Sequence, residues 1–179
     1  MHLKSSNLSR IIIVRHAHAL DREEFARKNP NDLLRPLSKK GRTQSKKIAH
    51  FVRDFLHTKP ISYLISSPAT RALQTIKPLS KILTHTPFAI CESIAPDCGC
   101  DGYIKLLEHY RDSQTLLIVG HQLDIEFFVR FLVGGASLTI KKGCVIELVR
   151  KTSDSQDSRN LTKWQDTFTL NLLIDPKRL

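Results

Sequence analysis

The sequence predicts an α/β protein, a three-layer α/β/α sandwich with a mostly parallel central sheet. Short apolar runs of strand length alternate with longer segments whose apolar residues recur at helical spacing. Reactive side chains directly follow several of these strands, as they do at the carboxyl edge of a parallel sheet. The chain has 179 residues and is 41% hydrophobic, so we expect residues 1–179 to form one domain with a buried core.

The first third of the chain contains two expected strands and one expected helix. Residues 10–14 form a run of strand length that we expect to be buried on both faces. Residues 20–36 are polar and contain two prolines, which predicts a long loop. Ser38 can cap a helix whose apolar stripe extends to Leu56, and a second strand is expected at 61–66.

The middle of the chain is punctuated by prolines. Pro68 is placed to begin a helix, with Ser67 before it as a cap. Pro78 predicts a kink or break in that helix, because proline lacks the backbone N–H that an interior position needs. A brief strand is expected at 88–91, and Asp101 is a candidate cap for the next helix.

The last third of the chain alternates in the same way. A helix at 124–133 is expected to end at Gly134 and Gly135. The expected strands of this part are 115–119, 145–149 and 168–174. A polar stretch, 151–160, is expected to join the last two strands as a hairpin loop.

Charge is the one unusual feature of the composition. Lys plus Arg is 28 and Asp plus Glu is 17, which gives 28 − 17 = +11. Such a field attracts phosphorylated substrates, acidic proteins, nucleic acid or anionic membranes, or it serves solubility alone. The absence of a basic stretch studded with aromatic residues argues against a nucleic-acid partner.

The sequence also favours one cellular compartment. No apolar run approaches the ~20 residues of a membrane span, and no apolar stretch precedes the first charge, so we expect a cytoplasmic protein without a membrane partner. Four cysteines in that compartment are expected to be reduced. The spacing Cys98-Gly99-Cys100 lacks the two-residue gap of a zinc knuckle, which favours plain thiols over a metal site.

Three expected strands are each followed by residues that suit phosphate. The first is followed by Arg15 and His16, the second by a segment that contains Arg71, and a third by His121 and Gln122. If these strands are parallel neighbours, two arginines and two histidines converge at one edge of the sheet. Guanidinium forks match phosphoryl oxygens bidentately, so the cluster predicts a site for a tetrahedral dianion.

Histidine beside arginine indicates chemistry as well as binding. Neighbouring Arg charges lower the pKa of His16 and keep its imidazole neutral and nucleophilic. A neutral imidazole can attack phosphorus and form a phosphohistidine, while His121 and the two arginines stabilise the charge on the phosphoryl oxygens. The arginines supply the electrostatic stabilisation, so we expect no metal ion and no cofactor.

These segments resemble the motifs of the histidine phosphatase superfamily, whose fold is phosphoglycerate mutase-like. Arg15-His16-Ala17 resembles its Arg-His-Gly signature, residues 66–75 its second arginine motif, and Gly120-His121-Gln122 its second-histidine motif. Arg35-Pro36-Leu37-Ser38 followed by Gly41 is similar to the SixA-type phosphohistidine phosphatase branch, and the small size fits that branch. The resemblance covers roughly residues 10 to 150.

The resemblance assigns roles to individual residues. It implies that His16 is the phosphate-accepting nucleophile, that Arg15 and Arg71 clamp the phosphate, and that His121 is the second pocket histidine. The residues expected to extend the substrate-binding site are Arg35, Ser67 and Gln122. Glu92 is the first candidate for the general acid, and Asp97 and Asp101 are the alternatives. Structural ion pairs, helix caps or surface charges are the alternative explanations for these residues.

The function expected from the resemblance is a metal-independent phosphatase that works through a phosphohistidine intermediate, with a phosphohistidine protein as its substrate. The alternatives are a phosphatase of small sugar or nucleotide phosphates and a non-catalytic phosphate-binding module. A small, open architecture favours a phosphoryl group carried on a protein.

Overall fold

A six-stranded sheet forms the centre of the molecule. The computed structural model describes residues 6–55, 60–135, 138–152 and 164–179. The strands are β1 (Arg10–Arg15), β2 (Tyr63–Ser66), β3 (Phe88–Ile90), β4 (Thr115–Gly120), β5 (Val145–Arg150) and β6 (Phe168–Ile174). Their order across the sheet is β3-β2-β4-β1-β5-β6. Strands β3, β2, β4 and β1 are parallel to one another, whereas β5 runs antiparallel to both β1 and β6.

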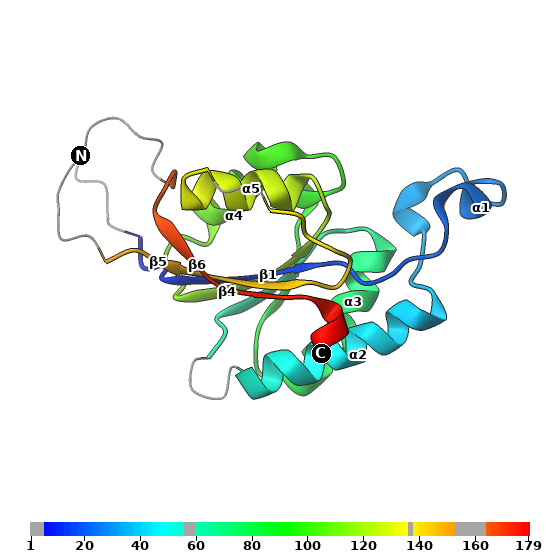
Figure 1. Cartoon of the computed structure of the whole chain (residues 1–179), viewed down its shortest axis with the longest axis horizontal. Coiled ribbons are helices and arrows are strands. Elements are labelled where there is room, and N and C mark those ends of the chain that lie inside the picture. The colour runs from blue at the N-terminus through cyan, green and yellow to red at the C-terminus, as the bar shows by residue number, and fades with distance from the viewer. Residues whose placement is uncertain (1–5, 56–59, 136–137, 153–163) are drawn as a thin grey trace.

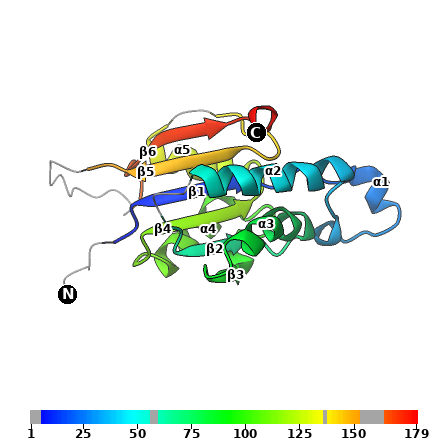
Figure 2. The same ribbon diagram turned by 90° about the horizontal axis from the view of Figure 1, so that it is seen from below.

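Helices cover both faces of this sheet (Figures 1 and 2). The α-helices are α1 (Arg22–Ala26), α2 (Lys39–Phe55), α3 (Thr70–Ile82), α4 (Gly99–His109) and α5 (Asp124–Val133). Short 3₁₀ turns are η1 (Asp32–Leu34), η2 (Glu92–Ile94) and η3 (Pro176–Arg178). Helices α2 and α3 pack on one face, and α4 and α5 on the other, which confirms the predicted three-layer sandwich (Figure 1).

The parallel register brings the predicted motifs to one edge of the sheet. Arg15 at the end of β1 is opposite Gly120 at the end of β4, and Ser66 at the end of β2 is opposite Val119. Three strands therefore end at the same level, and the residues that follow them emerge side by side.

The predicted loop at 20–36 contains more structure than the polar composition suggested. It forms α1 and η1, whose N-caps Asp21 and Asn31 accept backbone N–H groups. An antiparallel bridge between Ala19 and Leu37 closes its base. The short side chains that made the segment look irregular are the ones that cap these two turns.

Three expectations about helices were not met in full. Helix α3 does not begin at Pro68 with Ser67 as its cap, because its first residue is Thr70 and its N-cap is Ala69. The break allowed for at Pro78 is absent: α3 continues through the proline to Ile82, near the expected end at about Leu83. Ile76 and Leu79 are both buried on either side of the proline, and this packing offsets the lost hydrogen bond. Asp101 is not a cap either, because α4 already begins at Gly99 and Asp101 lies in its first turn.

Of the other expectations, one about α5 was met and others concern residues outside the described ranges. Helix α5 ends at Gly134, whose φ is 83°, as the glycine pair predicted. The predicted hairpin loop 151–160 falls largely on residues 153–163, which are outside the described residues, as does Leu56. No helix in the described ranges is long and apolar enough to cross a membrane.

Gly120 is required by close packing at the end of β4. A Cβ atom at this position would lie 1.9 Å from the Tyr103 hydroxyl oxygen. Tyr103 is fully buried, and its hydroxyl oxygen lies 3.4 Å from the backbone N of His121 as a hydrogen-bond acceptor. The tyrosine therefore fixes the position of the backbone at the end of β4, just before His121.

We expect Gly120→Ala to lower the free energy of unfolding by about 1–3 kcal/mol, because the added methyl overpacks a buried ring. Adding Tyr103→Phe removes the hydroxyl that the methyl meets, so the double variant should recover part of that loss. Urea denaturation of the three variants measures both effects. If the double variant lost more free energy of unfolding than the two single variants together, this packing argument would be contradicted.

Candidate active site

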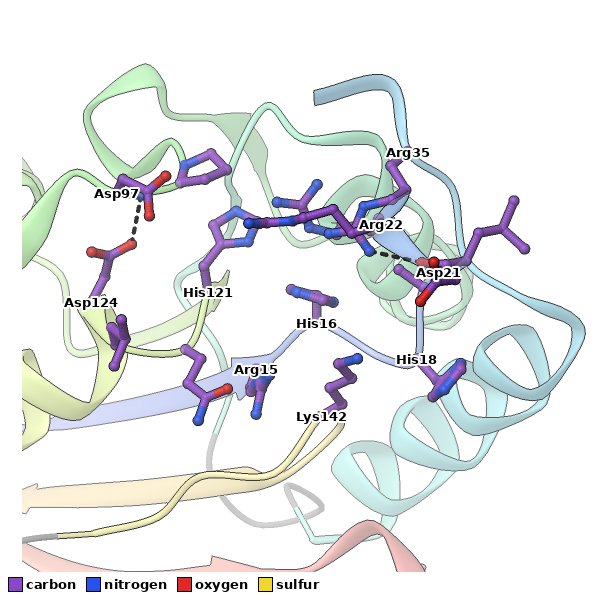
Figure 3. A pocket seen from close by; sticks show the side chains of 16 residues that line it. Arg15, His16, His18, Asp21, Arg22, Arg35, Asp97, His121, Asp124 and Lys142 are labelled. Carbon is purple, nitrogen blue, oxygen red and sulfur yellow. Dashed lines mark hydrogen bonds between the residues drawn. The ribbon is translucent and has the colours of Figure 1, made fainter. Parts of the chain in front are cut away.

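A pocket of about 450 Å³ opens at the carboxyl edge of the sheet (Figure 3). The cationic and imidazole side chains that line it are Arg15, His16, His18, Arg22, Arg35, Arg71, His121 and Lys142. The carboxylates in its wall are Asp21, Asp97 and Asp124. The four side chains expected at the centre, His16, Arg15, Arg71 and His121, are thus brought together, and the pocket suits an anion.

His16 directly follows β1 and is only 6% exposed. Its Nδ1 lies 2.8 Å from the carbonyl oxygen of Ala17. A carbonyl can only accept a hydrogen bond, so Nδ1 carries the proton and Nε2 has the free lone pair. Thr75 in α3 fixes the same turn, since its hydroxyl accepts from the Ala17 N–H and donates to the Arg71 carbonyl.

His121 faces His16 across the pocket. Their ring centroids are 5.2 Å apart, and Figure 3 shows the two rings converging from β4 and β1. His121 Nε2 lies 2.7 Å from the hydroxyl of Ser67. Ser67 is itself buried and does not line the pocket, so it orients His121 and makes no contact with the cavity.

Arg15 and Arg71 are buried guanidiniums, 8% and 2% exposed. Arg15 donates to the carbonyl of Ile140 at 2.6 Å, and Arg71 donates to the carbonyl of Asp32 at 2.8 Å. In the described part of the chain, only three buried side-chain polar atoms have no hydrogen-bond partner: Arg15 Nε, Arg71 Nε and His121 Nδ1. All three belong to this pocket, which indicates that its ligand accepts hydrogen bonds.

Asp32 contacts the arginines of the site, and the sequence analysis missed it. Its carboxylate lies 2.7 Å from Arg35 Nε, 3.0 Å from Arg71 Nη2 and 3.7 Å from Arg22 Nε. Burial would raise the pKa of Asp32, but the hydrogen bond from Arg35 and the charge of Arg71 outweigh burial and lower it. The only signal in the sequence was an acidic residue three positions before a motif arginine.

The segment that begins at Arg35 buttresses the turn after β1. Ser38 donates its backbone N–H to the carbonyl of His18 at 3.0 Å and its hydroxyl lies 2.9 Å from His18 Nδ1. Gly41 packs so closely that a Cβ there would lie 1.9 Å from the same carbonyl oxygen. The Arg-Pro-Leu-Ser and Gly motif therefore presses α2 against the turn that carries His16.

Both central histidines are neutral in the folded protein. Burial lowers the pKa of His16 to about 2, with smaller effects from His121 and Arg71. Burial lowers the pKa of His121 to about 3, and Arg71 contributes to the shift. The neutral form of His16 is the form that can donate an electron pair.

The predicted general acid is not at the pocket. Glu92 lies on η2, is exposed, and is not part of the pocket wall, and Asp101 is likewise outside it. Asp97 is exposed in the wall. Asp124 is buried, and its two oxygens accept the N–H groups of Asp97 and Gly99 at 3.0 and 2.9 Å.

The remaining candidates are placed as follows. Arg35 and Gln122 both line the pocket, and Gln122 Nε2 also donates to Glu126 at 3.3 Å. Lys142, which the sequence showed only as the second of two consecutive lysines, lines the pocket as well.

Among the described residues, no group of three or more His, Cys, Asp or Glu side chains is arranged to hold a metal ion. Burial raises the pKa values of the Cys98 and Cys100 thiols to about 12 and about 11.

Several solved structures with this fold are described as phosphatases. A candidate phosphohistidine phosphatase SixA from Agrobacterium tumefaciens superposes with a TM-score of 0.75 at 17% identity, covering 94% of this chain and 99% of that one. The protein histidine phosphatase SixA, solved with tungstate, gives 0.69 at 19% identity, with 94% and 98% covered. The α-ribazole phosphatase of Shigella flexneri gives 0.66 at 16% identity, with 93% and 96% covered. At these identities the likeness shows a common fold.

The sequence comparisons give one partial match. No curated protein matches the sequence. Residues 11–94 match the model of the histidine phosphatase superfamily (branch 1), and this segment contains His16, Arg35 and Arg71. The chain is therefore similar to histidine phosphatases in this segment, and it shares their fold.

Proposed function

We propose that this protein is a metal-independent phosphatase of the SixA type, which removes the phosphoryl group from a phosphohistidine on another protein by way of a phosphorylated His16. The observation that carries the proposal is that Arg15, Arg71 and His121 line one pocket with His16, and that one buried nitrogen of each of the three has no hydrogen-bond partner. In this proposal those three nitrogens are N–H donors and His16 Nε2 has the free lone pair. A phosphoryl group supplies three acceptor oxygens for those donors.

The first chemical step uses the geometry of His16. Its Nε2 attacks phosphorus, the N–P bond forms, and the bond from phosphorus to the leaving group breaks. Positive charge then develops on the imidazole, and the Nδ1–H donated to the Ala17 carbonyl stabilises it. Arg15 and Arg71 hold the phosphoryl oxygens throughout, so their charge is already in place when the transition state forms.

The second step returns the enzyme to its starting state. Water attacks phosphorus and gives one proton to the carboxylate that protonated the leaving group. The N–P bond breaks with its electron pair returning to Nε2, and orthophosphate leaves with the oxygen and the other proton of that water. The Ser67 hydroxyl donates to His121 Nε2 in this proposal, which places the proton of His121 on Nδ1. That N–H is the third donor to phosphate.

The proton for the leaving group comes from Asp97 in this proposal. It is the one carboxylate among the three candidates predicted from the sequence that lines the pocket. A phosphohistidine needs less help than an ester, because the second nitrogen of the leaving imidazole can already carry a proton.

The rim of the pocket favours a substrate carried on a protein. Leu20 is 41% exposed and Leu123 is 60% exposed, and both line the opening. Apolar side chains at an open rim can contact the surroundings of a phosphorylated residue, whereas a small polar metabolite gains little from them. Substrate profiling separates the two classes: a strong preference for one small phosphate over phosphohistidine proteins would support the small-molecule alternative.

Hydrolysis of p-nitrophenyl phosphate in EDTA tests the nucleophile. We expect the wild type to be active and His16→Ala to lose about a thousandfold or more in kcat, because no other group can accept the phosphoryl. His85→Ala is the matched control, since His85 is exposed and outside the pocket wall. Equal activity in the wild type and His16→Ala would show that His16 is not the nucleophile.

The lowered pKa values predict how stability depends on pH. The unfolded chain takes up protons on histidine below about pH 6.5, whereas His16 and His121 stay neutral in the fold until about pH 2 and 3. Each histidine therefore costs the folded state about 2 kcal/mol between about pH 7.5 and pH 5. In urea denaturation, the free energy of unfolding of His16→Asn should fall less steeply than that of the wild type as the pH is lowered over this range.

Nitrogen-15 NMR of the imidazole rings provides the control for that prediction. His16 and His121 should keep the chemical shifts of neutral imidazole at about pH 5. Protonation of His16 near its ordinary pKa would refute the idea that burial keeps the nucleophile neutral.

A further inference from the structure

A second, strongly basic groove of about 660 Å³ adjoins the active-site pocket. Its cationic side chains are Arg15, Lys40, Lys47, Lys141, Lys142 and Lys177. Asp175 is the one carboxylate of its wall in the described chain, and it is paired with Lys141 at 2.7 Å. Six cations against one carboxylate leave the groove with a large excess of positive charge.

One face of helix α2 forms the floor of the groove. Lys40, Thr43, Gln44 and Lys47 all line it. Their spacing of three, four and seven residues places them in a single stripe along about 10 Å of the helix. The neighbouring Lys39 and Lys46 are also exposed but do not line the groove. The consecutive lysines Lys39-Lys40 and Lys46-Lys47 thus each contribute one charge to the groove and one to another face of the helix.

The groove is continuous with the pocket. Arg15, His18 and Lys142 line both cavities, and Figure 3 shows the three along one side of the pocket. Gln44 fastens the shared wall, because it accepts the His18 N–H at 3.0 Å and donates to the Lys142 carbonyl at 2.8 Å. The C-terminal turn closes the far side, where Lys47 donates to the Leu179 carbonyl at 3.0 Å.

We propose that this groove docks an acidic face of the phosphoprotein substrate, so that carboxylates on one side of the phosphorylated residue contact Lys40, Lys47 and Lys177 while the phosphoryl group lies in the pocket. The proposal rests on the proposed function. It adds a substrate preference, for phosphorylated residues flanked by Asp and Glu.

The type of cation in each cavity supports a protein face over a compact anion. The pocket holds Arg15, Arg35 and Arg71 as buried forks, fixed by carbonyls or by Asp32, which is the arrangement that binds one phosphate. In the groove, Lys40, Lys47 and Lys177 are exposed point charges on flexible stems. Such charges suit a set of carboxylates spread over a surface and contribute mainly to specificity and to the association rate.

The lysine pairs provide a charge-matched experiment. The double variants Lys40→Glu/Lys47→Glu and Lys39→Glu/Lys46→Glu change the net charge equally and on the same helix. Substrates are a phosphohistidine peptide flanked by Asp and Glu, the same peptide with Asn and Gln, and p-nitrophenyl phosphate. We expect the groove variant to lose about tenfold or more in kcat/KM on the acidic peptide only, and the control variant to lose about twofold or less.

Binding of an unphosphorylated Asp- and Glu-rich peptide, measured by fluorescence anisotropy, tests the groove without catalysis. Loss of binding in the groove variant but not in its control supports docking, even if no phosphohistidine peptide is hydrolysed, in which case the proposed function alone fails. Equal effects of the two variants on the acidic peptide overturn the groove while hydrolysis still supports the function. Tighter binding of a single-stranded oligonucleotide through Lys40 and Lys47 than of the acidic peptide would assign the groove to nucleic acid and also overturn the proposal. Thermal melts confirm that both variants fold.

Discussion

The structure depends on keeping several guanidinium groups close together in a pocket that is largely shielded from water. Arg15, Arg35 and Arg71 repel one another, and burial removes the water that would screen them. Asp32 bridges two of them, and the carbonyls of Ile140, Leu20 and Asp32 each accept a further hydrogen bond from one of them. The site therefore needs a particular backbone path at 20–36, where all of these acceptors except Ile140 lie, before it can hold an anion.

Burial of the site also decides which histidine chemistry is available. Burial is the main cause of the lowered pKa values of His16 and His121, and the neighbouring arginine charges lower them further, so the fold favours the neutral imidazoles. The same enclosed pocket therefore concentrates positive charge that suits phosphate and keeps its two imidazoles unprotonated. The hydrogen bond from His16 to the Ala17 carbonyl and the hydrogen bond between His121 and the Ser67 hydroxyl then decide which nitrogen of each ring is available.

The sequence predicted the part of the site that follows from strand ends, because Arg15, His16, Arg71 and His121 each lie within a few residues of a buried strand and parallel strands end together. It did not reveal Asp32, whose role depends on a loop folding back over α3. It favoured Glu92 over Asp97 because Glu92 follows a strand, and position after a strand was the only guide. In the structure, the loop after η2 brings Asp97 to the pocket wall, whereas Glu92 lies outside it. It allowed for a break at Pro78 that the structure lacks, because local propensity does not include the packing of Ile76 and Leu79.

The Asp124 carboxylate has a mechanical consequence for the site. It is the first residue of α5, just after the second pocket histidine, and it grips the backbone on both sides of Cys98 in the loop that carries Asp97. These two hydrogen bonds tie the loop that carries Asp97 to the start of α5, although Asp97 and His121 are 24 positions apart in the sequence (121 − 97 = 24). Under the proposed roles, the side chain that donates to phosphate and the side chain that supplies the proton are therefore joined through the backbone contacts of a single carboxylate.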